Sequence, residues 1–411
     1  MPASPTAVHL PSPLFELERP AERIDTIINW GLGVDSTAFL AEMLTRPAAH
    51  GIDLARTAVI HMATGSEWPL THELAEKFML PLLREHNVRL VQLVRAGQEY
   101  AKGITVLDDS RQPARLIRRG EWTLWDEYET TGTVPQQAGP RKCSIRAKGI
   151  VGDRWALGAT DGPFRQLMGY NADEVGRALT DSREGNTELR TGVYPLIEWG
   201  WGRQRCEEYL LDRFGVVWPK SYCTFCCYPV SMGALPGHLD RMRRHPDLAG
   251  QVLRLEYTSV SLNPKARLFG RHSLLEQFDP ARPGDRPVLE AFERELACPW
   301  ALYHVRRILP ASKKDPAKRG QALRSVERVD LGRPAQLGRR LTAISERHRV
   351  QVETDPRYGR SRAWLRTRGT EFPITEELFT TAPHHVRNKQ EKRFEKEWAA
   401  ATGSGPPALP V

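Results

Sequence analysis

Short apolar segments alternate with amphipathic segments over the first hundred residues, and this alternation constrains the fold more than any other feature. The apolar runs around Ile27 and Ile28, in TAVIHMA and in VRLVQLV have the length and composition of buried strands. Between them, TAFLAEMLTR and the stretch from Thr71 to about His86 place apolar residues at helical spacing. Strands that alternate with helices form parallel sheets covered by helices. We therefore expect an α/β fold built on a parallel sheet.

Composition divides the chain into four parts. Residues 23–240 hold the α/β pattern, and residues 241–403 are basic, with amphipathic segments that predict a mainly helical domain. Residues 1–22 are typical of a flexible, Pro-rich leader, and residues 404–411 of a disordered tail. The leader lacks the basic start and apolar run of a signal peptide, and no apolar run approaches the roughly 20 residues that span a bilayer. We expect a cytoplasmic protein with no membrane partner.

Positive charge is concentrated in the second half of the chain. The net charge is +9, yet residues 241–411 carry 33 Lys and Arg against 20 Asp and Glu, whereas residues 1–240 carry 26 against 30. Such asymmetry indicates a polyanionic partner, and we expect nucleic acid. Arginines interleaved with Tyr358, Trp364 and Phe372 suit base stacking and phosphate contact. A solvated Arg-rich surface over a core stripe of aromatic residues is the alternative.

A Gly-rich turn, NWGLGVDST at residues 29–37, separates the first expected strand from the first expected helix. Its glycines let backbone N–H groups close on a phosphate, and the helix N-terminus adds the positive end of its dipole. Ser36 and Thr37 offer hydroxyl groups there, and Asp35 is suited to hold Mg²⁺ or to order the loop. The turn therefore predicts a phosphate-binding loop. An ordinary turn, with the helix capped by Asp or Ser, is the alternative.

This loop resembles the PP-loop, S-G-G-x-D-S, of the adenine-nucleotide α-hydrolase superfamily, which has a HUP-like nucleotide-binding domain. The superfamily includes the N-type ATP pyrophosphatases and the sulfonucleotide (PAPS) reductases. Asn29 stands where Ser is usual and Leu32 replaces a Gly, but four positions of the pattern are kept: Gly31, Gly33, Asp35 and Ser36. The resemblance implies that ATP and Mg²⁺ bind at this loop and that Asp35 and Ser36 take part in catalysis.

A second segment strengthens the resemblance. Residues 63–71, ATGSEWPLT, are similar to the D-T-G-x-E-x-P-E-T segment of the PAPS-reductase branch, with Ala63 and Leu70 in place of Asp and Glu. In that branch the segment follows the second strand and lies near the nucleotide. The resemblance therefore assigns nucleotide binding to three residues here: Thr64, Gly65 and Glu67.

A third segment follows in the same order along the chain. Residues 168–177, MGYNADEVGR, are similar to the family's G-x-x-x-x-E-S-x-x-R segment, although Val175 departs from Ser. Residues 194–199, YPLIEW, resemble the P-L-x-x-W stretch that comes next. The resemblance covers roughly residues 25–235. It implies nucleotide binding by Gly169 and Glu174 and a catalytic role for Arg177.

Four of the six cysteines stand in motif-like contexts that suit a metal centre. Cys143 is followed 80 residues later by the sequence Cys223-Thr-Phe-Cys226-Cys227. A Cys-x-x-Cys turn brings two thiolates together, as iron–sulfur clusters and Zn²⁺ require. Basic neighbours at Lys142, Arg146 and Lys220 favour the thiolate form. Cys206, on an expected helix, is typical of a packing residue.

The separation of these cysteines is similar to that of the cluster-binding sulfonucleotide reductases, with the order of single and paired cysteines reversed. We expect Cys143, Cys223 and Cys226 to hold a [4Fe–4S] cluster. The fourth ligand is Cys227, Cys298 or no protein group, and an open iron would suit a site that carries an extra sulfide. Zn²⁺ and plain buried cysteines are the alternatives.

The resemblance distinguishes between branches of the family. Sulfonucleotide reductases lack the complete pyrophosphatase loop and use a thiol in a C-terminal Glu-Cys-Gly-x-His sequence, which is absent here. An ATP pyrophosphatase fits better, with charge stabilised by Mg²⁺, loop amides and Arg95, Lys148 or Arg177. We expect it to adenylate DNA or tRNA for sulfur transfer, with a donor such as a cysteine desulfurase. A sulfonucleotide enzyme and a non-catalytic nucleotide-dependent regulatory module are the alternatives.

Overall fold

The first six strands of the computed structural model form one sheet in the order β4-β3-β2-β1-β5-β6. All neighbouring strands in it are parallel except β3 and β4, which are antiparallel. The strand bounds are Thr26–Asn29 (β1), Thr57–Met62 (β2), Arg89–Arg95 (β3), Ile104–Ser110 (β4), Phe164–Leu167 (β5) and Arg190–Val193 (β6). The expected α/β class is confirmed, with a sheet that is mixed and mostly parallel.

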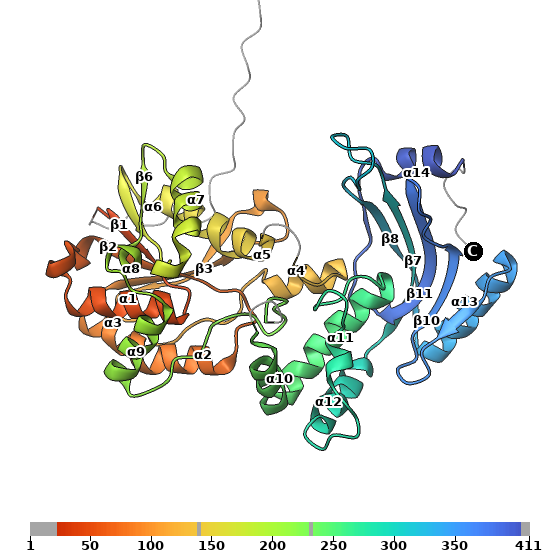
Figure 1. Ribbon diagram of the computed structural model, residues 1–411, viewed down its shortest axis with the longest axis horizontal. Coiled ribbons are helices and arrows are strands. Elements are labelled where there is room, and N and C mark those ends of the chain that lie inside the picture. The colour runs from red at the N-terminus through yellow and green to blue at the C-terminus, as the bar shows by residue number, and fades with distance from the viewer. Residues whose placement is uncertain (1–22, 138–140, 230–232, 404–411) are drawn as a thin grey trace, which may run out of the picture.

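Helices cover both faces of this first sheet, because its central strands are apolar on both sides. Ile28 and Val59 pack in one core cluster with α1 and α9, whereas Ile27 and Ile60 pack in another with Trp155 of α6. The helices are Val34–Thr45 (α1), Pro69–Leu74 (α2), Leu80–Glu85 (α3), Leu124–Thr131 (α4), Lys142–Ser144 (α5), Ile150–Ala159 (α6), Val175–Gly185 (α7), Pro195–Glu198 (α8) and Arg203–Phe214 (α9). Strands and helices through α9 make up the first lobe, shown in red to light green in Figure 1.

The structure describes residues 23–137, 141–229 and 233–403. The leader expected at residues 1–22 and the tail expected at residues 404–411 lie outside these ranges. Within them, no helix is both long enough and apolar enough to cross a membrane.

A second sheet, entirely antiparallel, forms the core of the C-terminal half, in the order β12-β8-β7-β11-β10-β9. Its strands are Trp300–Leu309 (β7), Leu323–Gly332 (β8), Val352–Thr354 (β9), Ser361–Arg366 (β10), Ile374–Pro383 (β11) and Lys389–Gln390 (β12). The helices are Leu235–Arg244 (α10), Pro246–Leu262 (α11), Arg286–Leu296 (α12), Pro334–His348 (α13) and Phe394–Thr402 (α14). These strands and helices form the second lobe, shown in dark green to blue in Figure 1.

The expectation of a mainly helical domain over residues 241–403 is therefore wrong in part: α11 to α14 are present, but a six-stranded sheet lies among them. The strands were concealed by charged residues that are buried and paired. Strand β7 is mostly apolar but is interrupted by the buried Arg306 and Arg307, and β10 buries Arg362. Arg362 donates hydrogen bonds to the carbonyl oxygens of Val260 and Ser261 at the end of α11, so it supports the fold.

Helix α4 connects the two lobes (Figure 1). Near its C-terminal end, Glu129 accepts a 2.6 Å hydrogen bond from Arg254 of α11, and the carbonyl oxygen of Thr130 accepts one of 2.9 Å from the Arg387 backbone. Gly132, which ends the helix, has a positive φ of 58°. A Cβ there would lie 2.4 Å from a methyl carbon of Leu262, so only glycine fits between the lobes at this point.

Candidate functional site

Strand β1 lies at the point where the first sheet changes direction. From β1 the chain moves to β2 and β3 on one side, and later to β5 and β6 on the other. In open α/β sheets, ligands bind beyond the carboxyl ends of the strands at such a switch point. The segments that follow β1, β2 and β5 are the three segments that the sequence singled out for nucleotide binding. The topology therefore brings them to one edge of the sheet.

The loop after β1 is held in a specific conformation. The backbone N–H of Gly31 donates to Ser36 Oγ over 3.2 Å, and that hydroxyl donates to the carbonyl oxygen of Gly33 over 3.2 Å. Leu32 has a positive φ of 58°. This left-handed conformation is unfavourable for any residue with a Cβ, and it favours glycine. This is the position at which the PP-loop pattern has glycine. Trp218 secures the loop by donating to the carbonyl oxygen of Leu32 over 3.0 Å.

Helix α1 begins directly after this loop with an open N-terminus. No side chain caps it, so the backbone N–H groups of its first turn have no capping partner in the part of the chain that the structure describes. Gly169, after β5, packs against this turn: a Cβ on Gly169 would lie 2.8 Å from Ser36 Cα. Thr37, also expected to bind nucleotide, is fully buried and accepts a hydrogen bond from Trp30. The structure thus brings Ser36 and Gly169 together and places Thr37 in the core.

Asp35 has one paired and one unpaired carboxylate oxygen. Arg203, at the start of α9, donates to Oδ2 over 2.6 Å. The other oxygen, Oδ1, is buried and has no hydrogen-bond partner among the residues with described positions. Burial raises the pKa of Asp35, and the Arg203 charge opposes that shift. A buried acceptor without a partner is costly, which suits an atom that a cation or a donor group would engage.

Thr64, Gly65 and Glu67 lie beside the β1 loop and reach the cysteine segment. The carbonyl oxygen of Thr64 accepts a hydrogen bond from the first residue of α4, Leu124. Gly65 has a positive φ of 81°, and a Cβ there would lie 2.5 Å from the Thr123 side chain. Glu67 makes an isolated antiparallel bridge with Cys223. These contacts join the nucleotide segments, α4 and the cysteines in one region.

The Glu67 side chain is buried and faces three polar groups. Lys148 Nζ lies 3.4 Å from one carboxylate oxygen, and His72 Nε2 lies 3.7 Å from the other. His61 belongs to the same group, because His61, Glu67 and His72 each offer a ligand atom within 4.8 Å of the others. Burial lowers the pKa of His61 to about 4, so this imidazole is neutral near pH 7. Lys148 Nζ also lies 3.8 Å from where a Gly31 Cβ would be, so its charge is near the loop.

Glu174 and Arg177 form an ion pair with each other at the start of α7. The Arg177 guanidinium lies 4.6 Å from the centroid of the Tyr170 ring, and half of its side chain is exposed. Arg95, a candidate for charge stabilisation, is buried and paired with Glu127. Of the three candidate cations, Arg95 is therefore engaged in the core, Arg177 is near the surface, and Lys148 lies at the loop.

Cys143, Cys223 and Cys227 lie near Tyr128 of α4, and Cys226 lies near the other three cysteines. Burial raises the pKa of Tyr128, and the charges of Cys143, Cys223 and Cys227 raise it further. Within the Cys-x-x-Cys turn, the backbone N–H of Cys226 donates to the carbonyl oxygen of Cys223 over 2.9 Å. The four cysteines thus lie in one region, but they are not among the described groups of three whose ligand atoms all lie within 4.8 Å of one another.

Burial, rather than the basic neighbours, dominates the cysteine pKa values. It raises the pKa of Cys223 to about 12 and that of Cys226 to about 11. Arg146, expected to favour the thiolate, donates to Glu127 over 2.5 Å instead. Lys220 lowers the pKa of Cys226, as expected of a basic neighbour, but burial outweighs it. A metal ion or cluster would have to displace the thiol protons on binding.

The remaining two cysteines lie elsewhere. Cys206 is fully buried on α9 near Asp35, as a packing residue should be. Cys298 lies in the second lobe, next to His384 and His385. Of the two cysteines considered for a fourth cluster ligand, only Cys227 is near Cys143, Cys223 and Cys226.

Arg203 and His61 are the site residues that the sequence patterns missed. Arg203 comes four residues after the end of the segment that resembles P-L-x-x-W, but an Arg in the first turn of a helix carries no signal of its own. His61 occupies a strand, where a histidine is usually a core residue. Only the fold places its side chain beside Glu67.

Compared with models of protein families, with curated proteins and with solved structures, the chain matches none of them significantly. By its fold, the chain is an α/β protein with a mostly parallel sheet and a second, antiparallel sheet. Its candidate site is a group of polar residues at the switch point of the first sheet.

Proposed function

We propose that the protein is an ATP pyrophosphatase that adenylates a nucleic acid for sulfur transfer. The observation that carries the proposal is the arrangement at the switch point. An uncapped N-terminus of α1, a loop held in the left-handed conformation and the unpaired Oδ1 of Asp35 lie together there. Backbone donors suit phosphate oxygens, and an unpaired carboxylate oxygen suits Mg²⁺.

The proposed reaction cleaves ATP between its α and β phosphates. A substrate oxygen attacks the α-phosphorus, the bond to the bridging oxygen breaks, and pyrophosphate leaves. The N–H groups at the start of α1 and the Lys148 ammonium would stabilise the charge that develops on the phosphates. Gly169 packs directly against Ser36, so the segment after β5 supports the first turn of α1. Asp35 would hold the Mg²⁺ that accompanies pyrophosphate.

The cysteine group supports a second step next to the first. Cys143, Cys223, Cys226 and Cys227 offer only sulfur donors, which suit a [4Fe–4S] cluster. Such a cluster, when bound, would supply sulfide chemistry beside the adenylated substrate. A nucleophilic sulfur from a donor such as a cysteine desulfurase would then displace AMP, which departs with the activated oxygen. The Glu67–Cys223 bridge puts this group next to the nucleotide segments.

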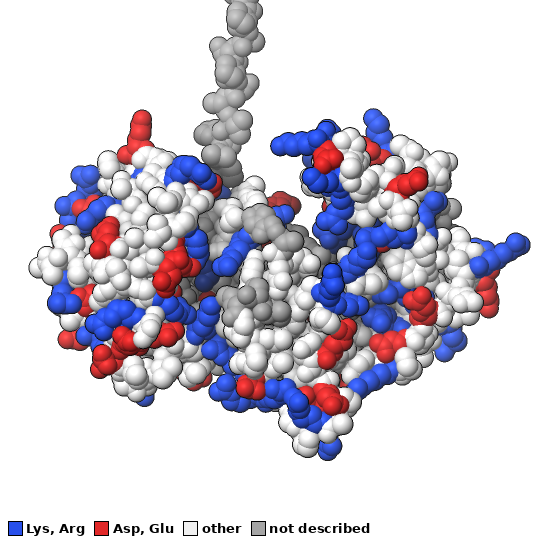
Figure 2. Space-filling model, in the orientation of Figure 1, with Lys and Arg blue, Asp and Glu red and all other residues white. Residues whose placement is uncertain are grey.

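Surface charge supports nucleic acid as the substrate class. The turn between β7 and β8 carries four exposed basic residues: Lys313, Lys314, Lys318 and Arg319. Figure 2 shows basic side chains along the edge of the second lobe that faces the first lobe. A phosphate backbone in this position would be attracted by these charges and would lead toward the site.

The test is to incubate the protein, purified without oxygen, with Mg-ATP in the presence and absence of DNA or tRNA. Pyrophosphate and AMP are measured for the wild type, for Asp35→Ala and for a matched control, Asp212→Asn, at an exposed position on α9. We expect pyrophosphate release that nucleic acid stimulates, that Asp35→Ala abolishes and that Asp212→Asn keeps. Bound ATP without pyrophosphate under any condition would instead support a non-catalytic regulatory module.

A further inference from the structure

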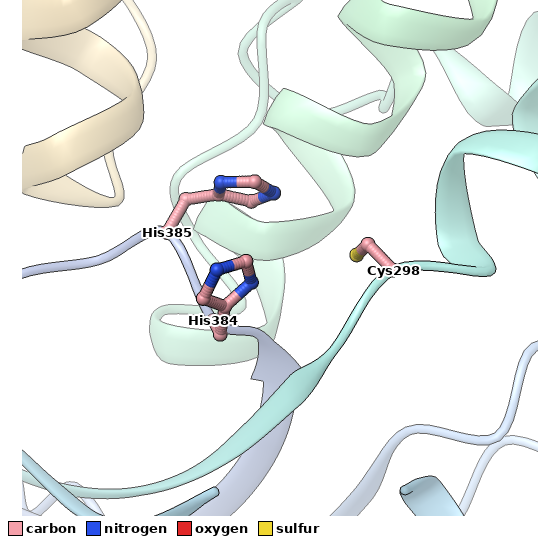
Figure 3. Close-up of side chains that lie close together, drawn as sticks. All are labelled: Cys298, His384 and His385. Atoms are coloured by element: carbon pink, nitrogen blue, oxygen red, sulfur yellow. The ribbon is translucent and has the colours of Figure 1, made fainter. Parts of the chain in front are cut away.

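A second group of metal-ligand side chains lies in the second lobe, away from the switch point. Cys298, His384 and His385 each offer a ligand atom within 4.8 Å of the other two. Cys298 lies between α12 and β7, and the two histidines directly follow β11. Figure 3 shows the Cys298 sulfur pointing toward the two imidazole rings. The three residues come from two segments that are 86 positions apart in the sequence.

The sheet fixes these segments relative to each other. Pairing of β7 with β11 puts Trp300 opposite Pro383, one residue before the histidines. The backbone N–H of His384 donates to the carbonyl oxygen of Pro299 over 3.2 Å, and its Nδ1 lies 3.1 Å from the same oxygen. With the proton on Nδ1, this contact leaves Nε2 as the nitrogen with a free lone pair. Metal-binding histidines are commonly held by such a bond to a carbonyl oxygen.

The group lies beside an ion pair. Oε1 of Glu129, on α4, lies 4.0 Å from His385 Nδ1, and Arg254 donates a 2.6 Å hydrogen bond to the same oxygen. Arg254 and Glu129 thus bring opposite charges next to the group, and Arg254 orients the carboxylate. The three candidate ligands are all partly exposed, so an ion can reach them from solvent.

We propose that Cys298, His384 and His385 bind a zinc ion. One sulfur and two imidazole nitrogens form a donor set that Zn²⁺ prefers and that hard cations such as Mg²⁺ and Ca²⁺ do not. Because Arg254 engages Glu129, the fourth position belongs to a water molecule. The ion would fasten the end of β11 to the start of β7, next to the end of α4. This site is separate from the four cysteines of the first lobe and does not depend on the proposed ATP chemistry.

The experiment uses the full chain, stripped of metal by a chelator under reducing conditions and titrated with Zn²⁺ in a calorimeter. We compare the wild type with Cys298→Ser and His385→Ala. Because the first-lobe cysteines would also bind metal under the proposed function, Cys226→Ser is measured in parallel, and His272→Ala serves as a control at an exposed histidine. Cys298→Ser and His385→Ala are expected to weaken one binding event by more than about 100-fold, since even outer-shell changes cost roughly 10- to 100-fold. Cys226→Ser and His272→Ala should leave that event unchanged.

Cobalt substitution gives a second readout that does not require the variants to be equally stable. Co²⁺ added to the metal-free wild type should give a sulfur-to-cobalt charge-transfer band and the visible bands of a four-coordinate ion. In His384→Gln, which keeps a side chain of similar size, the visible bands from this site should be lost. Equal Zn²⁺ stoichiometry and affinity in the wild type, Cys298→Ser and His385→Ala would overturn the proposal. So would a cobalt spectrum that only Cys226→Ser alters.

Discussion

The two lobes differ in how many of their buried polar side-chain atoms lack a hydrogen-bond partner. Among the residues that the structure describes, nine buried side-chain atoms without a hydrogen-bond partner belong to residues 29–122, and four to residues 238–362. Seven of the nine lie on or next to the carboxyl ends of β1 and β2: in Asn29, Asp35, His61, Ser66, Trp68, Thr71 and His72. The unpaired atoms of the first lobe are therefore concentrated at the candidate site.

In the second lobe, buried charges have partners close by. Arg307 donates to Glu376 over 2.7 Å in the sheet, and His304 lies 2.9 Å from Glu377. Glu256 of α11 accepts hydrogen bonds from the backbone of residues 268, 274 and 275. These groups stabilise the fold and leave little capacity for a ligand.

An unpaired buried polar atom costs stability, so a protein keeps several of them together only where something else engages them. The first lobe bears that cost at one edge, whereas the second lobe uses its polar groups to hold strands and helices together. Substitutions in the first lobe should therefore change function more than stability, and substitutions in the second should do the reverse.

The largest expected effect is on catalysis, from Asp35→Asn. The amide cannot hold Mg²⁺ as a carboxylate does, so pyrophosphate release should fall by more than about 100-fold, a loss typical of removing a transition-state contact. Because burial disfavours the ionised form of Asp35, the free energy of unfolding should change by less than about 1 kcal/mol. Pyrophosphate release and urea unfolding measure the two quantities. A large loss of stability with unchanged activity would reverse the assigned roles.

Glu256→Gln should lower the free energy of unfolding and leave pyrophosphate release unchanged. Leu268 and Leu274 each donate a backbone N–H to a different oxygen of Glu256, over 2.7 Å in both cases. In glutamine an NH₂ group replaces one of the two oxygens, so one of these backbone N–H groups would face another donor and lose its acceptor. We expect a loss of about 2–3 kcal/mol in the free energy of unfolding at pH 6. Pyrophosphate released per folded molecule should stay the same. A fall in activity without a fall in stability would show that the lobes do not divide their roles in this way.

Gly169→Ala tests the contact between the segment after β5 and α1. The new Cβ would lie 2.8 Å from Ser36 Cα and 3.0 Å from the Phe39 ring, and the backbone of α1 cannot move away easily. We expect a loss of about 2 kcal/mol in unfolding free energy and weaker ATP binding. Gly176→Ala on α7 is the matched control, because nothing lies within 4 Å of its Cβ. Equal unfolding free energies and equal ATP affinities in Gly169→Ala and Gly176→Ala would contradict the close packing of Gly169 against α1.

The smallest expected effect is a pH dependence in the second lobe. Burial raises the pKa of Glu256 from 4.5 to about 7, so the folded state binds this proton more tightly than the unfolded state. The stabilisation is complete below pH 4.5 and is lost as the pH rises through 7. The stability difference between the wild type and Glu256→Gln should therefore narrow by about 1–2 kcal/mol from pH 6 to pH 8. Urea unfolding at several pH values measures it, and a constant or widening difference would contradict the shift.

Local sequence patterns were sufficient for the first three strands of the first lobe and insufficient for the second lobe. The strands around Ile28 and Val59 are apolar on both faces, and the loop between β1 and α1 is continuous in sequence, so both could be predicted. Strand β7 carries His304, Arg306 and Arg307, whose partners are at least 45 residues away. A pattern read along the chain cannot show that such charges are buried and paired.

The same limit applied to the candidate sites. Residues at the β1 loop are neighbours in sequence, so their grouping followed from the motif. Arg203 reaches Asp35 across 168 positions, and Cys298 reaches His384 across 86. The second sheet, which the sequence did not predict, is what places Cys298 beside His384.

Helix α4 has a consequence for communication between these regions. Its first turn is fixed to the Thr64 carbonyl oxygen by Leu124 and locked by a capping box between Thr123 and Asp126, and its last turn carries Glu129. Eight residues make a rod of about 12 Å, too short to bend appreciably. A nucleotide that displaced Thr64 would therefore move Glu129 relative to the three residues proposed to bind zinc. Because coupling of binding free energies is reciprocal, zinc occupancy would change nucleotide affinity by the same factor.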